Sequence, residues 1–141
     1  MGLRIECQNA DGITTLNLTG ELTLGAGHLQ LRRRIVSLLR GGNNKIIVNF
    51  ERVTKIDEAG TGILELALAR SQSGGGKVVL LKLDKSKIDS PHALDLDERF
   101  EAYQDGQDAI NSFFPDRAIK HYDILTFVEQ QLDPSKTETK S

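Results

Sequence analysis

Two pairs of adjacent carboxylates are the residues of this chain best suited to acid–base chemistry. They are Asp57–Glu58 and Asp97–Glu98. Paired carboxylates can divide the roles of general acid and general base, but they need a nucleophile, a metal ion or a positioned histidine beside them. No such group accompanies either pair in the sequence. We therefore expect surface or helix-capping carboxylates, no catalytic residues and no enzyme.

The residues that bind metals or form disulfides are too few and too scattered to form a site. Cys7 is the single cysteine, and the three histidines, His28, His92 and His121, lack the spacing of metal ligands. The sequence therefore predicts no metal, no cofactor and no internal disulfide. Cys7 alternates with polar neighbours in an apolar strand pattern, which indicates a small buried side chain.

Two segments have residues that bind anions in other proteins. Gly74–Gly75–Gly76–Lys77 lacks the first glycine and the Ser/Thr of a phosphate-binding loop, and it precedes a predicted strand rather than a helix. Arg32, Arg33 and Arg34 point around most of a helix, so we expect a solvated face. With 18 basic and 20 acidic residues, the net charge of −2 gives no general attraction to nucleic acid.

These residues lie on a predicted alternation of strands and helices. Alternating apolar residues on both sides of Asp11–Gly12 indicate a hairpin of two strands, and the apolar runs at 45–50 and 78–83 indicate buried strands. Helical periodicity covers residues 28–40 and begins again after Asp57. This order predicts an α/β domain.

The C-terminal part is predicted as a short edge strand at 100–103, a helix at 106–114, an extra helix at 115–133 and a flexible tail at 134–141. Residues 1–114 form a single domain in this interpretation. No apolar stretch approaches the ~20 residues that span a bilayer, and the N-terminus lacks the pattern of a leader peptide. We therefore expect a cytoplasmic protein without membrane insertion.

Three motifs in this order carry a resemblance to a known family. Gly20–Glu21–Leu22 precedes the first helix, Ile56–Asp57–Glu58–Ala59–Gly60 opens the second, and an apolar strand follows the glycine-rich turn, over residues 74–83. Residues 3 to 114 resemble the STAS domain of bacterial anti-sigma factor antagonists. The resemblance implies a mixed sheet of four to five strands with helices packed on it.

The resemblance also implies a protein-binding switch. Members of the family bind an anti-sigma factor, often a serine kinase, and phosphorylation of a loop serine ends that contact. The alternative within the family is an accessory subunit of a sensory complex or a membrane transporter, and a homodimer is left open. The implied switch loop consists of Ile56, Asp57, Glu58, Ala59, Gly60, Thr61 and Gly62, with flanking contacts at Glu21, Leu22, Thr23, Leu24 and Glu65.

This chain departs from the family pattern at the phosphorylated serine, because Glu58 occupies that position and Ala59 replaces the next serine. Glu58 is either a plain carboxylate at a helix start or a permanent, incomplete imitation of phosphoserine. We expect Asp57 to cap the helix. Thr61 is the nearest hydroxyl, and its place one turn into the helix favours a backbone hydrogen bond or packing over phosphorylation.

Overall fold

A computed structural model describes residues 2–89 and 96–114, where strands and helices alternate as the sequence predicted. The 3-10 helix η1 and the short helix α3 are present in addition and were not predicted. The elements in chain order are β1 (Leu3–Ala10), β2 (Ile13–Leu22), α1 (Ala26–Arg40), β3 (Lys45–Asp57), α2 (Glu58–Ser73), β4 (Lys77–Leu81), η1 (Lys85–Lys87), β5 (Ile88–Asp89), α3 (Leu96–Arg99), β6 (Glu101–Tyr103) and α4 (Gly106–Asn111).

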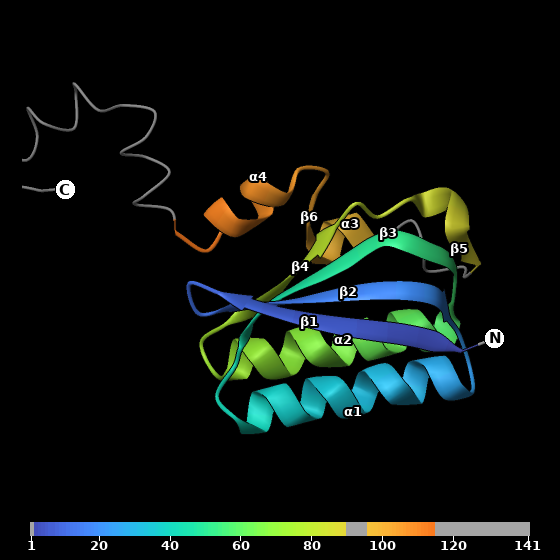
Figure 1. The fold of residues 1–141 in the computed structure, drawn as a ribbon, viewed down its shortest axis with the longest axis horizontal. Coiled ribbons are helices and arrows are strands. Elements are labelled where there is room, and N and C mark those ends of the chain that lie inside the picture. The colour runs from blue at the N-terminus through green and yellow to red at the C-terminus, as the bar shows by residue number, and fades with distance from the viewer. Residues whose placement is uncertain (1, 90–95, 115–141) are drawn as a thin grey trace, which may run out of the picture. The chain divides into compact units, whose positions relative to one another are not determined.

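The strands form one mixed sheet in the order β1-β2-β3-β4-β6 (Figure 1). β1 and β2 form the predicted antiparallel hairpin, whereas β3 runs parallel to β2 and β4, and β6 runs parallel to β4. The predicted α/β class is confirmed, but four to five strands was too low because β5 pairs with the end of β3 as a sixth. Its two residues are too few to show an alternating pattern.

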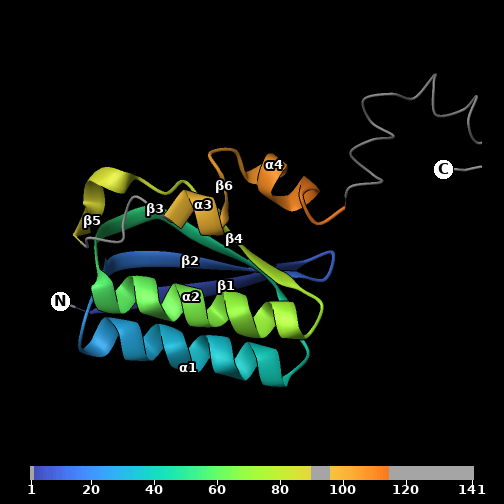
Figure 2. The ribbon, with the colours of Figure 1, turned by 180° about the vertical axis from the view of Figure 1, so that it is seen from behind.

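Helices α1 and α2 lie side by side against the same face of the sheet (Figures 1 and 2). Each helix connects two parallel strands, so both run in the same direction and start at the same end of the sheet. The core between the helices and the sheet is formed by fully buried aliphatic side chains, among them Leu16, Leu18, Leu31, Ile46, Val48, Leu64 and Leu80.

Strand β3 is longer than the sequence indicated. The prediction ended at Phe50, where the charged pair Glu51–Arg52 interrupts the apolar run, but the strand continues to Asp57. In this second half Val53 and Ile56 are buried, and irregularities in the pairing with β2 keep them on the core side. The extension matters because it places Asp57 at the start of α2.

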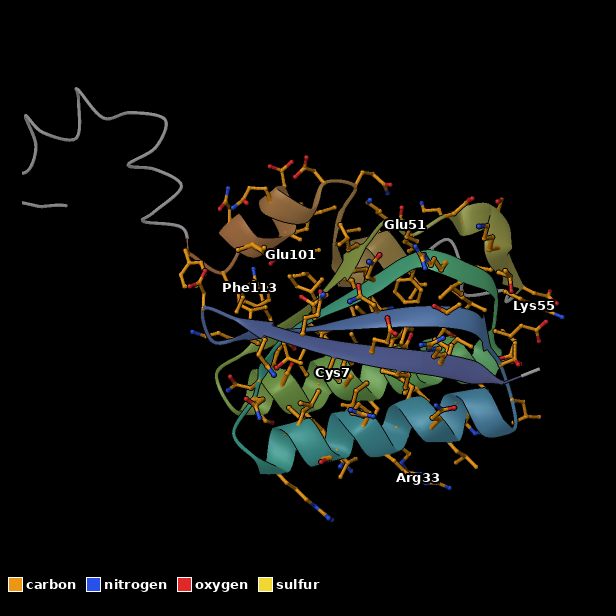
Figure 3. All side chains as sticks on the ribbon, viewed as in Figure 1. Cys7, Arg33, Glu51, Lys55, Glu101 and Phe113 are labelled. Atoms are coloured by element: carbon orange, nitrogen blue, oxygen red, sulfur yellow. The ribbon has the colours of Figure 1, made fainter. Side chains whose placement is uncertain are left out.

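The prediction that Cys7 is buried is wrong. Cys7 shares the helix-facing side of β1 with Leu3, which is buried, but its own side chain is exposed (Figure 3). β1 is an edge strand, so only one neighbouring strand flanks Cys7. Arg34 donates a hydrogen bond from Nη1 to Cys7 Sγ at 3.1 Å, so a polar side chain lies where an apolar cover was expected.

The C-terminal elements follow the predictions in part. β6 occupies residues 101–103 at the edge of the sheet, and α4 ends at Asn111, three residues before the predicted end of that helix. The chain divides into one compact unit that ends at Ala109 and a second that begins at Ile110. The predicted helix at 115–133 and the tail at 134–141 lie outside the described residues.

Candidate functional site

Asp57 joins two loops that are far apart in the sequence. Its Oδ1 accepts a hydrogen bond from the backbone N–H of Gly60 at 3.0 Å, which confirms the predicted N-cap of α2. Its Oδ2 accepts a second hydrogen bond from the backbone N–H of Leu24 at 2.9 Å. One carboxylate therefore fixes the loop before α1 against the start of α2, a link that the sequence did not show.

The electrostatic surroundings keep Asp57 charged. Its partial burial raises the pKa, but hydrogen bonds from the backbone amides of Leu24, Gly60 and Ala59, together with the nearby His28, outweigh that effect. The net result is a pKa below the usual value of 3.8. The folded state therefore favours the ionised form of this carboxyl group.

Replacing Asp57 by asparagine is expected to change how stability depends on pH. Because the folded state lowers the pKa, the charge of Asp57 stabilises the protein above pH 3.8, and this contribution is lost as the pH falls through the folded-state pKa. Urea unfolding of wild type and Asp57→Asn between pH 3 and pH 7 should show a difference that shrinks below about pH 4.

Asp57→Ala removes the backbone hydrogen bonds that the carboxylate accepts and serves as the comparison. It should cost about 1 kcal/mol or more at neutral pH, since an N-cap alone contributes about that much. If the difference between wild type and Asp57→Asn stayed constant over the whole pH range, the charge of Asp57 would play no part in stability.

Glu58 and Thr61 have opposite accessibility although they share the first turn of α2. Glu58 is exposed, whereas Thr61 is 2% exposed and its Oγ1 donates a hydrogen bond to the carbonyl oxygen of Glu58 at 2.9 Å. The expectation that Thr61 packs and bonds the backbone is confirmed. A kinase would have to open this helical turn to reach the Thr61 hydroxyl.

The contact role expected for part of the loop needs correction. Leu22 is 0% and Ile56 is 1% exposed, so these side chains support the loop from the core and do not present themselves to a partner. Gly60 is buried as well. These positions belong to the motifs that carry the resemblance, and a motif does not show which of its residues lie in the core.

The accessible residues form a small surface at the start of α2. Leu24 is 74% exposed and is one of two large apolar side chains with this property among the described residues. Glu58 and Gly62 are exposed, while Glu21, Thr23, Ala59 and Glu65 are partly buried. We call the group Leu24, Asp57, Glu58, Gly62 and Glu65 the α2-start surface.

Arg99 is a residue of this region that sequence reasoning missed. Its guanidinium forms an ion pair with Glu65, and together they line a cavity of about 230 Å³ with Glu58, Thr61 and Gly62. Arg99 comes from α3, 34 positions after Glu65, and no motif marked it. It places a cation beside the acidic residues Glu58 and Glu65 of the α2-start surface.

Among the described residues, no group of three or more His, Cys, Asp or Glu side chains is arranged to hold a metal ion. No helix in residues 2–89 and 96–114 is long and apolar enough to cross a bilayer.

Comparison with solved structures shows the fold of anti-sigma factor antagonists. A protein from Thermotoga maritima assigned to this class matches with a TM-score of 0.70 and 22% identity, over 77% of this chain and 93% of its own. SpoIIAA in its unphosphorylated form matches with a TM-score of 0.61 and 22% identity, over 77% and 96%. At these identities the likeness shows the fold alone.

A third structure, an anti-sigma factor antagonist from Mycobacterium paratuberculosis, has a TM-score of 0.64 at 16% identity, over 79% of this chain and 93% of its own. No match was found among curated proteins. The family model of the STAS domain matches residues 4–109, which contain the sheet apart from Leu3, α1, α2 and the α2-start surface. The chain therefore belongs to the STAS domain family.

Proposed function

We propose that this protein is a cytoplasmic, non-enzymatic interaction module that acts as an anti-sigma factor antagonist in a partner-switching pathway. Its partner would be an anti-sigma factor or a related serine kinase, which binds at the α2-start surface. The observation that supports this most directly is the hydrogen bond from the backbone N–H of Leu24 to Asp57, because it holds exposed Leu24 at the residue that precedes exposed Glu58. Apolar anchors with charged neighbours are typical of protein-binding surfaces.

Glu58 gives the proposed switch a fixed charge. It occupies the position at which the family has a phosphorylated serine, and Thr61 is buried and bonded to the backbone. A carboxylate has one negative charge, against about 1.5 to 2 for a phosphoryl group, so the imitation of phosphoserine would be incomplete. We propose that Glu58 weakens partner binding permanently and only in part.

Replacing Glu58 tests this proposal. Glu58→Ser and Glu58→Gln should both bind the partner more tightly than wild type, by roughly fivefold, because both remove a charge that opposes binding across the interface. Folding should change less, since a carboxylate at a helix N-terminus contributes about 0.3–1 kcal/mol. Calorimetric titration measures the affinities, and urea unfolding measures the stabilities.

The partner for this titration is obtained by affinity capture with the wild-type chain and is then purified. Glu6→Gln, the same charge change on exposed β1, is the matched control and should leave the affinity unchanged. Weaker binding by both Glu58 variants would mean that the carboxylate is an attractive contact. Affinities equal to wild type would make Glu58 a plain helix-start carboxylate.

The identity of the captured partner tests the function itself. An anti-sigma factor or a soluble serine kinase supports partner switching. A membrane transporter or a sensory complex would instead make the chain an accessory subunit. Incubating the captured kinase with labelled ATP should label Glu58→Ser and leave wild type unlabelled. Label on Thr61 of wild type would show that the switch uses that hydroxyl instead.

A further inference from the structure

The formally charged side chains of helix α1 are all arginines, and the helix presents a second face to solvent. It contains four arginines and no acidic residue, although the protein as a whole has a net charge of −2. One stripe of the helix, with Leu31 and Ile35, is buried in the core. The opposite stripe begins at Leu29 and ends at Arg40, and Figure 3 shows that Arg33 projects away from the sheet.

This outer stripe forms one wall of an open groove of about 620 Å³, and Arg70 of α2 contributes from the neighbouring helix. Apolar and charged side chains line the groove, together with Ser37. Leu29 and Val36 are apolar, and Leu29 is 41% exposed. The charged side chains are the four guanidinium groups of Arg32, Arg33, Arg40 and Arg70, and no carboxylate lines the groove.

The four guanidinium groups lack an anionic partner in the part of the chain that the structure describes. Two other arginines do have an anionic partner, since Arg4 binds Glu6 and Arg99 binds Glu65. No ion pair or side-chain hydrogen bond involves the four groove arginines within residues 2–89 and 96–114. Four cations in one concave site repel one another, and an anionic ligand would relieve that repulsion.

The shape and the apolar content of the groove favour a peptide segment over a membrane surface. From Leu29 to Arg40 the stripe extends about 16 Å along the helix axis, the length of roughly three helical turns. An interfacial membrane helix would insert a wide apolar face. Here the main apolar stripe of α1 is buried in the core. The apolar surface of the groove therefore consists of Leu29 and the partly buried Val36.

We infer that the groove between α1 and α2 is a docking site for an acidic amphipathic helix of a partner protein. Its carboxylates would pair with the four arginines, and one or two aliphatic side chains would contact Leu29 and Val36. The groove contains none of the residues of the α2-start surface. The inference is therefore independent of the proposed switch and of the partner that binds there.

Binding of a synthetic peptide to the full chain tests this inference. The probe is a fluorescein-labelled acidic peptide of about 14 residues with leucines at helical i, i+4 and i+7 spacing. A scrambled peptide of the same composition is its control. Fluorescence anisotropy should show binding of the patterned peptide that weakens with added salt. The scrambled peptide should bind at least about fivefold more weakly, since its apolar face is lost.

Charge reversal in the groove separates specific docking from general attraction. Arg33→Glu/Arg40→Glu should weaken peptide binding about tenfold or more. Arg52→Glu/Lys55→Glu makes the same charge change at exposed positions of β3 and should stay within about twofold of wild type. Arg33→Gln/Arg40→Gln, which only removes charge, should lie between the two, and circular dichroism checks that every variant is folded.

Three results would overturn the inference. Equal binding of the patterned and scrambled peptides would exclude an amphipathic helix as the occupant. Equal losses of peptide affinity in the groove variant and in the β3 variant would mean that net charge alone explains the binding. Binding of anionic phosphatidylglycerol vesicles that is lost in Arg33→Glu/Arg40→Glu, without binding of the peptide, would assign the face to a membrane surface.

Discussion

Replacing Leu22 by alanine is expected to lower the free energy of unfolding by about 2–5 kcal/mol, the range for leucines truncated in a core. Leu22 is 0% exposed and belongs to the same apolar cluster as Ile56 and Leu64. The neighbouring Leu24→Ala should change stability by less than about 0.5 kcal/mol, because that side chain is 74% exposed.

Urea unfolding of both variants measures this contrast, and partner titration gives the complementary result. Leu24→Ala should weaken binding while it leaves stability unchanged, since the side chain is an exposed anchor of the proposed partner surface. A large loss of stability in Leu24→Ala, or a small one in Leu22→Ala, would mean that the two leucines have been assigned to the wrong sides of this loop.

Alanine substitutions at Gly60 and Gly62 should have effects of opposite sign, although both glycines lie in the first turns of α2. A Cβ atom at Gly60 would overlap the carbonyl oxygen of Leu22 and would lie 2.9 Å from Leu22 Cγ and 3.1 Å from Ile56 Cγ2. Helix propensity favours alanine by about 1 kcal/mol, but relieving this overlap has to displace backbone. We expect Gly60→Ala to lose about 1–3 kcal/mol.

Gly62→Ala is the matched control for Gly60→Ala. Apart from the adjoining residues and backbone of α2 itself, no atom lies within 4 Å of a Cβ built at Gly62, so alanine meets open space there. The expected result is a gain of about 0.5–1 kcal/mol from helix propensity and reduced freedom of the unfolded chain. Thermal and urea unfolding of the two variants measure these changes in stability. A gain of stability in Gly60→Ala would show that α2 does not pack closely on the end of β2.

Local patterns in the sequence were enough to predict most elements of the fold. The alternating residues before and after Asp11–Gly12 predicted the hairpin of β1 and β2, and the helical period of residues 28–40 predicted α1. The cap at Asp57 and the backbone bond of Thr61 were also correct. These features depend on residues within a few positions of one another, whose geometry is set by backbone periodicity and capping chemistry.

The tertiary structure decided what depends on residues distant in the chain. Asp57 binds the N–H of Leu24 across 33 positions, and Arg99 reaches Glu65 from another helix. The exposure of Cys7 likewise depends on its place in the edge strand β1, beside Arg34 of α1.

The two candidate surfaces likewise depend partly on local sequence and partly on tertiary contacts. The sequence marked the Ile56–Gly62 loop, but the packing of the loop against the core determined that Leu22 faces inward and Leu24 outward. The sequence showed the arginines of α1, but a groove exists only because α2 places Arg70 beside them. Residue type and spacing determine which groups a local segment holds, whereas contacts between segments determine which groups meet and which remain accessible.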